Sequence, residues 1–177
     1  GAVRVRMVGA DAAFDLNGPN RCELLDAEGY RRHAERLGPD PLRKDADPER
    51  AWRRISRSKA AVGAMLMNQE VIAGVGNIYR CEVLHLLGIH PERPGKDVTR
   101  DEFDRLWAKL VELMTIGVKH NRIIIEDPER VGKPRGRMTR DERLRVYKKE
   151  TCPDCSAAID EWTLGGRKVF ACAACQD

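Results

Sequence analysis

Four cysteines near the carboxyl end are spaced as two CxxC pairs. Cys152-Pro153-Asp154-Cys155 and Cys172-Ala173-Ala174-Cys175 are separated by 16 residues. Each CxxC turn can present two sulfurs to one ion, and four thiolates suit a tetrahedral Zn²⁺. Because all four positions are sulfur, no coordination position stays open, so the spacing predicts one structural Zn²⁺ and not a catalytic metal. The alternatives are a rubredoxin-like iron site, four free thiols, or disulfides, which fit poorly with a chain whose start shows no export signal.

The residues between the two cysteine pairs predict a short β-hairpin. Residues 162–164 (WTL) and 168–170 (KVF) have the composition of strands, and Gly165-Gly166 between them permits the positive φ angles of a two-residue turn. A segment of about 25 residues buries little core, so we expect the metal to supply much of its folding free energy. The two remaining cysteines, Cys22 and Cys81, are predicted to be buried free thiols.

A glycine-rich segment, residues 68–79 (NQEVIAGVGNIY), is the second chemical pattern. Gly74 and Gly76 let the backbone turn tightly or approach a ligand. Asn77 is a good N-cap for a helix over residues 78–87, and the amides at a helix start attract phosphate. The Asn77 side chain could also reach a phosphate itself. These residues alone leave phosphate contact and simple helix capping as alternatives.

Positive charge is concentrated in two stretches of a mildly basic chain, whose 32 Lys and Arg against 28 Asp and Glu give a net charge of +4. Residues 51–60 contain four bases and no acid; these bases are Arg53, Arg54, Arg57 and Lys59. Residues 128–149 contain nine bases against three acids; the bases are Arg130, Lys133, Arg135, Arg137, Arg140, Arg143, Arg145, Lys148 and Lys149. Such clustering is typical of phosphate binding, and the alternative is a solvated basic loop. No run of about 18 apolar residues occurs, which excludes a membrane-spanning helix.

Helices are needed to position these segments. Asp47-Pro48-Glu49 combines an N-cap, a first-position proline and a first-turn acid, which predicts a helix start. A further helix is expected over residues 59–67. Thr99 and Glu102 form a capping box ahead of a long helix with one apolar face, made by Phe103, Leu106, Trp107, Leu110, Leu113, Met114 and Gly117. Residues 37–42 (LGPDPL) predict an ordered linker.

The first 29 residues follow a strand pattern. Residues 3–8 (VRVRMV), 13–16 (AFDL) and 21–25 (RCELL) are predicted strands, with a turn at residues 17–20. Three short strands need a partner sheet or a helix to cover them. We therefore expect the tail of a β domain whose beginning is missing.

These motifs together resemble one family. Residues 68–69 (NQ), 71–79 (VIAGVGNIY), Glu82 and 88–91 (GIHP) are similar to the helix-two-turns-helix motif of the formamidopyrimidine-DNA glycosylase and endonuclease VIII family. Gly166-Arg167 and the final CxxCQ resemble that family's zinc finger, and residues 37–42 resemble its interdomain segment. The matches run from Leu37 to Gln176, so the chain is identified as the C-terminal portion of a member.

The resemblance implies base-excision repair, in which oxidised bases are removed from damaged double-stranded DNA and the abasic site is cleaved by β,δ-elimination. It implies that Asn77, with backbone help from the turn at Gly76, contacts a phosphate flanking the lesion, and that Arg167 inserts near the same phosphates. Glu82 matches a carboxylate near the catalytic pocket, with a surface or helix-pairing role as the alternative. Lys59 lies close to a basic residue of the first motif helix.

The catalytic nucleophile implied by the family is not found in this sequence. The family uses an N-terminal proline amine followed by Glu, whereas this chain starts at Gly1. We therefore expect a DNA-binding clamp that is inactive on its own, with no catalytic residue in this chain. Residues 17–21 (NGPNR) fall where the formamidopyrimidine branch carries a loop with Arg and Phe, which favours the endonuclease VIII branch. A non-catalytic nucleic-acid-binding module and a protein-interaction zinc ribbon are the alternatives.

The expected fold class is mainly α with a C-terminal β-hairpin zinc finger, preceded by the last strands of a truncated β-sandwich domain. The expected domains are residues 1–29, the helical DNA-binding residues 30–150 with the basic segment 128–149, and the zinc finger 151–177. We expect a monomer located in the cytoplasm or nucleoid, with no membrane partner.

Overall fold

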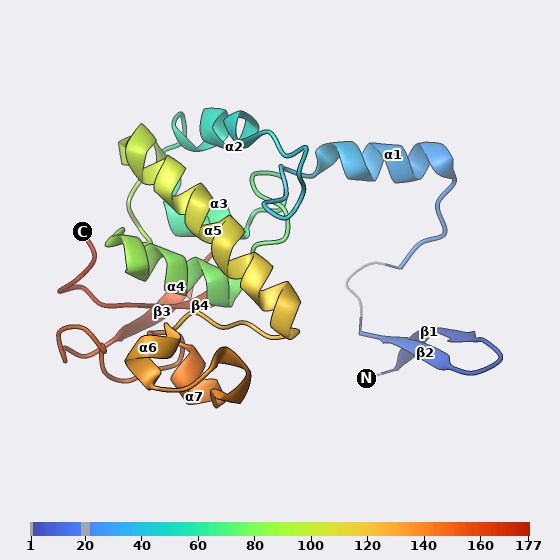
Figure 1. Cartoon of the computed structure of the whole chain (residues 1–177). Coiled ribbons are helices and arrows are strands. Elements are labelled where there is room, and N and C mark those ends of the chain that lie inside the picture. The colour runs from blue at the N-terminus through green and yellow to red at the C-terminus, as the bar shows by residue number, and fades with distance from the viewer. Residues whose placement is uncertain (1, 19–21) are drawn as a thin grey trace. The chain divides into compact units, whose positions relative to one another are not determined.

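The computed structural model describes residues 2–18 and 22–177, and Figure 1 shows the elements in chain order. The chain forms two compact units, residues 1–36 and 37–177, which are described separately. The boundaries expected from the sequence, at residues 29/30 and 150/151, stay predictions. Within the described residues, no helix has both the length and the apolar character needed to cross a membrane.

The first unit contains one β-hairpin and one helix. Strands β1 (Val3–Val8) and β2 (Ala13–Asn17) pair antiparallel, and helix α1 spans Ala27–Arg36. The third expected strand is wrong, because residues 22–25 have no strand pairing. Cys22 is exposed, so its prediction as a buried thiol is also wrong. Most of the loop expected at residues 17–21, namely residues 19–21, lies outside the described residues.

The second unit is mainly helical, as expected. Its helices are α2 (Pro48–Ile55), α3 (Val62–Met67), α4 (Asn77–Leu87), α5 (Arg100–His120), α6 (Pro128–Val131) and α7 (Arg140–Arg143), with 3₁₀ turns at Gly95–Asp97 and Arg135–Arg137. Strands β3 (Asp160–Leu164) and β4 (Arg167–Ala171) form an antiparallel C-terminal hairpin.

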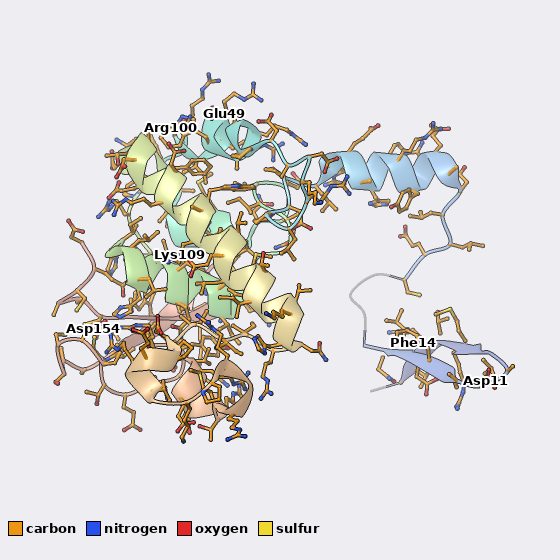
Figure 2. The ribbon with its side chains drawn as sticks, in the orientation of Figure 1. Asp11, Phe14, Glu49, Arg100, Lys109 and Asp154 are labelled. Carbon is orange, nitrogen blue, oxygen red and sulfur yellow. The ribbon has the colours of Figure 1, made fainter. Side chains whose placement is uncertain are left out.

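Helix α5 begins and packs as its sequence predicts. Thr99 and Glu102 make both hydrogen bonds of the capping box, and the predicted apolar face is buried except for the half-buried Trp107. Helix α2 begins with Asp47 accepting from the Glu49 amide. Glu49 also pairs with Arg100 at 2.6 Å, which ties the starts of α2 and α5 together (Figure 2).

Helix α3 starts three residues later than predicted, at Val62 instead of residue 59. The backbone of the preceding residues is engaged elsewhere: the Val62 amide donates to the Arg93 carbonyl at 2.8 Å, and the Gly95 amide donates to the Ala60 carbonyl at 2.9 Å. A chain that pairs with another segment cannot also form the first helical turn, so the long-range pairing delays the helix.

The C-terminal hairpin turns through Gly165 and Gly166, as predicted. Their φ angles are 61° and 74°, in the left-handed region that favours glycine. Val169 and Phe170 of β4 are buried with Cys81 of α4 and Val146, so the hairpin shares a small core with the helical part. Cys81 is a buried free thiol, as predicted, and burial raises its pKa.

Candidate metal centre and nucleic-acid interface

The four C-terminal cysteines converge on one point. Their sulfur atoms all lie within 4.8 Å of one another, with Cys152 and Cys175 at 3.9 Å and Cys155 and Cys172 at 3.4 Å. Sulfurs around one tetrahedral ion with metal–sulfur bonds near 2.3 Å would be about 3.8 Å apart. The cysteines are free and not bridged by disulfides. The backbone amide of Ala157 lowers the pKa of Cys155 to about 7, whereas the hydrogen bond to Cys155 raises the pKa of Cys175 and burial raises the pKa of Cys172.

Buried polar groups attach the first CxxC turn to α4. His85 of α4 has a side chain only 1% exposed, and its Nε2 lies 2.9 Å from the Asp154 carboxylate. The Asp154 carboxylate, labelled in Figure 2, also accepts hydrogen bonds from Arg145 and, at 3.0 Å, from Arg130. These bonds, the one from Arg145 most of all, hold the pKa of Asp154 well below its usual range. Because the His85 ring is held by these groups, we interpret it as a docking residue and not a metal ligand.

The second CxxC turn is attached by the residue that follows it. The Gln176 side chain accepts from the Cys172 amide and donates to the Ile89 carbonyl, each at 2.9 Å. Its Oε1 also lies 3.4 Å from His85 Nδ1. Both halves of the metal centre are therefore fixed to the same helix and the turn after it.

The glycine-rich turn before α4 is held by a side chain that the motif contains. Gln69 accepts from the Gly74 amide at 2.8 Å and donates to the Val75 carbonyl at 2.9 Å.

The predicted linker at residues 37–42 packs onto this turn, where a Cβ on Gly38 would lie 2.4 Å from the Val71 carbonyl oxygen. That contact leaves room only for glycine at position 38.

Asn77 is not the N-cap of α4, contrary to the sequence-based expectation. Gly76 takes that position with extended backbone angles, and Asn77 is the first helical residue. The Asn77 amide group donates to the Lys168 carbonyl of β4 at 2.8 Å, which is a contact across 91 residues. Among the described residues, no side-chain cap bonds the first turn of α4, and a Cβ on Gly76 would meet nothing within 4 Å. The helix start therefore keeps backbone amides and open space available to an anion.

Arg80, one turn after Asn77, is a site residue that sequence reasoning missed. Its side chain is fully buried, and one terminal nitrogen donates to the Leu164 carbonyl at 2.8 Å. The other donates to the Lys168 carbonyl at 3.2 Å and to the Asn77 side chain. Burial lowers the pKa of this guanidinium. An arginine three residues after Asn77 lies on the same face of a helix, and this spacing is the signal that could have identified it.

The structure brings three of the four predicted DNA-contact residues together. Arg167 is exposed at the start of β4, and its carbonyl lies 3.4 Å from the same Arg80 nitrogen that binds Asn77. Gly76 immediately precedes Asn77. Lys59 is exposed before α3 and contacts neither Asn77 nor Arg167 among the described residues. The buried Arg80 therefore joins two motifs that are 90 positions apart in the chain, at the half-buried Asn77 and the exposed Arg167.

Glu82 is fully buried and binds the backbone of the basic segment. Its carboxylate accepts from the amides of Arg145, Val146 and Tyr147 at distances of 2.9–3.2 Å. Burial raises the pKa of Glu82, and these amides oppose the rise. Full burial excludes the surface alternative, and the partners of Glu82 are backbone amides of a loop and not another helix. The role near a catalytic pocket stays a prediction.

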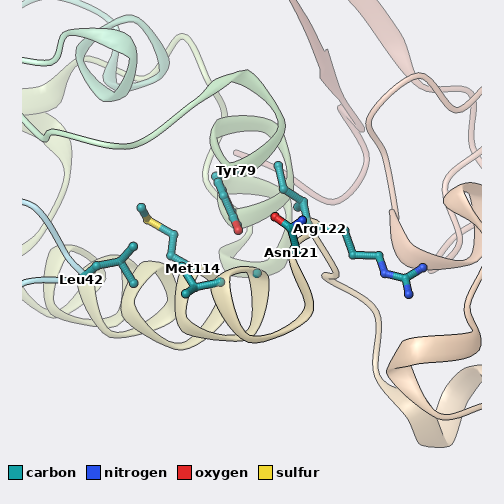
Figure 3. Close-up of a pocket in the computed structure, with 8 residues that line it drawn as sticks. Leu42, Tyr79, Met114, Asn121 and Arg122 are labelled. Atoms are coloured by element: carbon teal, nitrogen blue, oxygen red, sulfur yellow. The ribbon is translucent and has the colours of Figure 1, made fainter. Parts of the chain in front are cut away.

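A largely apolar pocket of about 260 Å³ lies between α4 and the end of α5 (Figure 3). Tyr79 and Met114 line it, and the Tyr79 hydroxyl donates to the Leu113 carbonyl at 3.4 Å. Burial raises the pKa of Tyr79. The ionisable residues that line it are Tyr79 and Arg122.

The family model described as the formamidopyrimidine-DNA glycosylase H2TH domain matches residues 37–129. This chain belongs to the formamidopyrimidine-DNA glycosylase and endonuclease VIII family. The match covers α2 to α5, including Asn77 and Arg80, so the helix-two-turns-helix identification is confirmed.

Individual relatives agree with the family assignment. "Endonuclease 8 1" of Mycobacterium tuberculosis strain H37Rv is 45% identical over an alignment of 178 positions. The alignment covers 99% of this chain and 66% of the relative. The formamidopyrimidine-DNA glycosylase of Zymomonas mobilis is 34% identical over 87% of this chain and 55% of its own length. The chain therefore spans slightly under two thirds of the first relative and about half of the second.

Solved structures of the family have the same fold. The MutM (Fpg) protein of Thermus thermophilus superposes with a TM-score of 0.77 at 27% identity, covering 98% of this chain and 68% of that chain. Lactococcus lactis Fpg in complex with abasic-site DNA gives a TM-score of 0.68 at 27% identity, covering 84% of this chain and 54% of that chain. The second match extends the likeness to a protein seen on damaged DNA.

Proposed function

We propose that this chain forms the DNA-binding clamp of a DNA glycosylase and abasic-site lyase. Such an enzyme removes oxidised bases from damaged double-stranded DNA and then cleaves the strand by β,δ-elimination. The observation that carries the proposal is the joining of Asn77 and Arg167 through Arg80. The complex of Lactococcus lactis Fpg with abasic-site DNA supports it, and so does the relative named Endonuclease 8 1.

The proposed contacts are electrostatic and do not depend on the base sequence of the DNA. We expect the amides at the start of α4, and the Asn77 side-chain N–H that does not bind Lys168, to contact one phosphate. The Arg167 guanidinium can bind an adjacent phosphate in a bidentate manner. Such contacts fix the register of the protein on the duplex without reading bases. The clamp would therefore hold DNA in position for chemistry on an extrahelical base.

We propose that the ion held by Cys152, Cys155, Cys172 and Cys175 is Zn²⁺. A closed set of four thiolates next to a short hairpin is the donor set of structural zinc, which supplies folding free energy and no open catalytic position. Asp154 and Gln176, which lie beside these cysteines, contact His85 of α4 and the Ile89 carbonyl after it. The metal centre would therefore hold β4 and its Arg167 against α4. Metal analysis of the purified protein should find one zinc per chain, and iron in its place would contradict the assignment.

Replacing Arg167 with Ala should weaken DNA binding by about tenfold for all sequences alike. One lost phosphate contact should also reduce the slope of log affinity against log salt by about 1. Fluorescence anisotropy with several duplexes, each over a series of salt concentrations, measures both quantities. Thr163→Ala, a change at an exposed position of β3, is the control and should bind as wild type. A loss confined to one sequence would contradict the phosphate role.

The 177-residue polypeptide is expected to bind abasic DNA without forming a Schiff base. The proposed lyase step needs the N-terminal proline amine that the family implies, which these residues do not contain. Borohydride trapping with abasic-site DNA tests this, with a proline-initiated glycosylase of the family as the positive control. A covalent adduct from the 177-residue polypeptide would show that another amine of this chain is the nucleophile.

A further inference from the structure

Residues 127–142, hereafter the basic loop, leave and re-enter the fold at a narrow neck. The amides of Ile125 and Glu126 both donate to the Arg143 carbonyl, at 2.8 Å and 3.2 Å. Next to these bonds, the Arg145 guanidinium binds both oxygens of the Glu126 carboxylate, at 2.8 Å and 3.0 Å. The basic loop contains α6 and most of α7 (Figure 1), and an ion pair therefore helps to close it.

The ion pair at the neck is nearly buried and is fixed to α4. The side chain of Arg145 is 6% exposed and that of Glu126 is 11% exposed. The Arg145 amide donates to the Glu82 carboxylate of α4 at 3.0 Å and 3.1 Å. Opening a buried pair is strongly unfavourable, because the charge that stays behind has lost its partner. The neck is therefore a defined structure and not a solvated crossing of two strands of chain.

The second terminal nitrogen of Arg145 reaches the metal centre. It donates to the carboxylate of Asp154, which lies between Cys152 and Cys155 in the first CxxC turn. A carboxylate oxygen of Asp154 and a ring nitrogen of His85 both lie within 4.8 Å of the Cys152 sulfur. One guanidinium therefore connects the neck of the basic loop to the turn that carries two of the four cysteines.

The charges at this connection favour a bound metal. Four thiolates around one divalent cation carry a net charge of about −2, and the Asp154 carboxylate beside Cys152 adds repulsion to it. Arg145 opposes the Asp154 charge, and so does Arg130 of the basic loop, which donates to the same carboxylate at 3.0 Å. Groups that support metal ligands in this way commonly change metal affinity by about 10–100-fold. The contacts that close the neck should therefore also favour metal binding.

Ion pairs are the main contacts between the basic loop and the residues that lead to the first CxxC turn. A cavity of about 340 Å³ lies at this junction. Most of its lining is charged; the charged residues are Glu126, Arg130, Asp141, Glu142, Arg145 and Lys149. Because apolar packing contributes little across a charged cavity, the bonds of Arg145 and Arg130 to Asp154 are the contacts that can transmit a change in the metal centre.

We propose that Arg145 is a positioning residue that couples metal binding at the four cysteines to the order of the basic loop. The proposal rests on the proposed function, because it takes the cysteines to hold a metal. The bound metal fixes the first CxxC turn, and Asp154 then holds the Arg145 guanidinium against Glu126. Loss of the metal frees the turn and loosens the neck. By linkage, metal binding favours the closed neck by the same factor as closing the neck raises metal affinity.

Hydrogen exchange of residues 127–142 in the 177-residue protein, with zinc bound and after chelation, tests the coupling. We expect chelation to speed exchange in the basic loop of wild type by about tenfold. Asp154→Ala keeps the ion pair at the neck but removes the link to the turn. Its loop should therefore exchange at the same rate with and without zinc, and its zinc affinity should fall about tenfold in competition with a chelator. Arg105→Met on α5 is the control and should behave as wild type.

Replacements of Arg145 separate positioning from packing. Arg145→Met should make the basic loop exchange fast in the zinc-loaded protein, while β3 and β4 stay protected. Arg145→Lys should recover part of the zinc affinity, because an ammonium keeps the charge but cannot bridge two carboxylates. In the Asp154→Ala background, Arg145→Met should cost little further zinc affinity, whereas a role in packing alone would cost the same in both backgrounds. If Arg145→Met does not fold, Asp154→Ala alone decides.

The outcomes separate this proposal from the proposed function. If wild type holds zinc but its basic loop exchanges at the same rate after chelation, the coupling is wrong and the zinc assignment stands. The coupling is also wrong if Asp154→Ala responds to chelation as wild type does, because the change then travels by another route. Wild type that binds no zinc would overturn both the zinc assignment and the coupling.

Discussion

Replacing Cys155 with Ser, or removing the metal with a chelator, is expected to unfold the C-terminal hairpin and to abolish duplex binding. Structural Zn²⁺ contributes on the order of 10 kcal/mol of binding free energy in small fingers. The apolar core of the hairpin is small: among the described residues, Val169, Phe170 and Ala171 of β4 are buried, and Trp162 and Leu164 of β3 are partly buried. Without the metal, β4 would leave α4 and take Arg167 with it.

The helical part should survive this loss. Helix α5 and its neighbours form a separate core of buried residues that contains no part of the hairpin. Circular dichroism should therefore retain most of its helical signal while hydrogen exchange at β3 and β4 becomes fast. Cys22→Ser, at an exposed cysteine that is not one of the four clustered cysteines, is the matched control and should retain metal and binding. Undiminished duplex affinity in the chelated protein would contradict the role assigned to the finger.

Replacing the buried Arg80 with Met is expected to destabilise the protein by about 2–4 kcal/mol, because buried acceptors left without a donor cost roughly 1–3 kcal/mol each. Methionine occupies similar space but leaves the Leu164 carbonyl without its hydrogen bond from Arg80. It also releases the Asn77 side chain from one of its two partners. Because Asn77 loses its bond to Arg80, we expect duplex binding by the folded variant to weaken by about tenfold, which corresponds to about 1.4 kcal/mol of binding free energy.

The matched control for Arg80 is Arg105→Met on α5. Arg105 pairs with Asp101 on the helix surface, and an exposed pair contributes about 0–1 kcal/mol. Urea denaturation gives the free energy of unfolding, and anisotropy gives affinity under conditions where both variants are folded. Arg80→Lys should recover part of the loss, because an ammonium keeps the charge but cannot span two carbonyls as a guanidinium does. If Arg80→Met binds duplex DNA as tightly as wild type, Arg80 is structural only.

Local patterns identified most of the elements of the second unit. The capping box at Thr99, the proline at position 48 and the glycine pair at 165–166 act through neighbours a few residues away, so their effects can be read in the sequence. The predictions that were wrong depended on distant partners. Helix α3 starts late because residues 60–62 pair with residues 93–95, and Cys22 is exposed because the strand expected around it does not form.

By itself, the sequence determined the four cysteine ligands, the family motif and the residue types that can bind phosphate. Each depends on residue identity and short spacing, which fix local geometry before any folding. Only the tertiary structure decided that Asn77 binds β4 instead of capping α4, that Arg80 joins the two motifs, and which bases of segment 128–149 pair with acids. These outcomes depend on which groups meet across many residues in the folded chain, and burial and pairing then set whether a charge stabilises the fold or stays free to bind DNA.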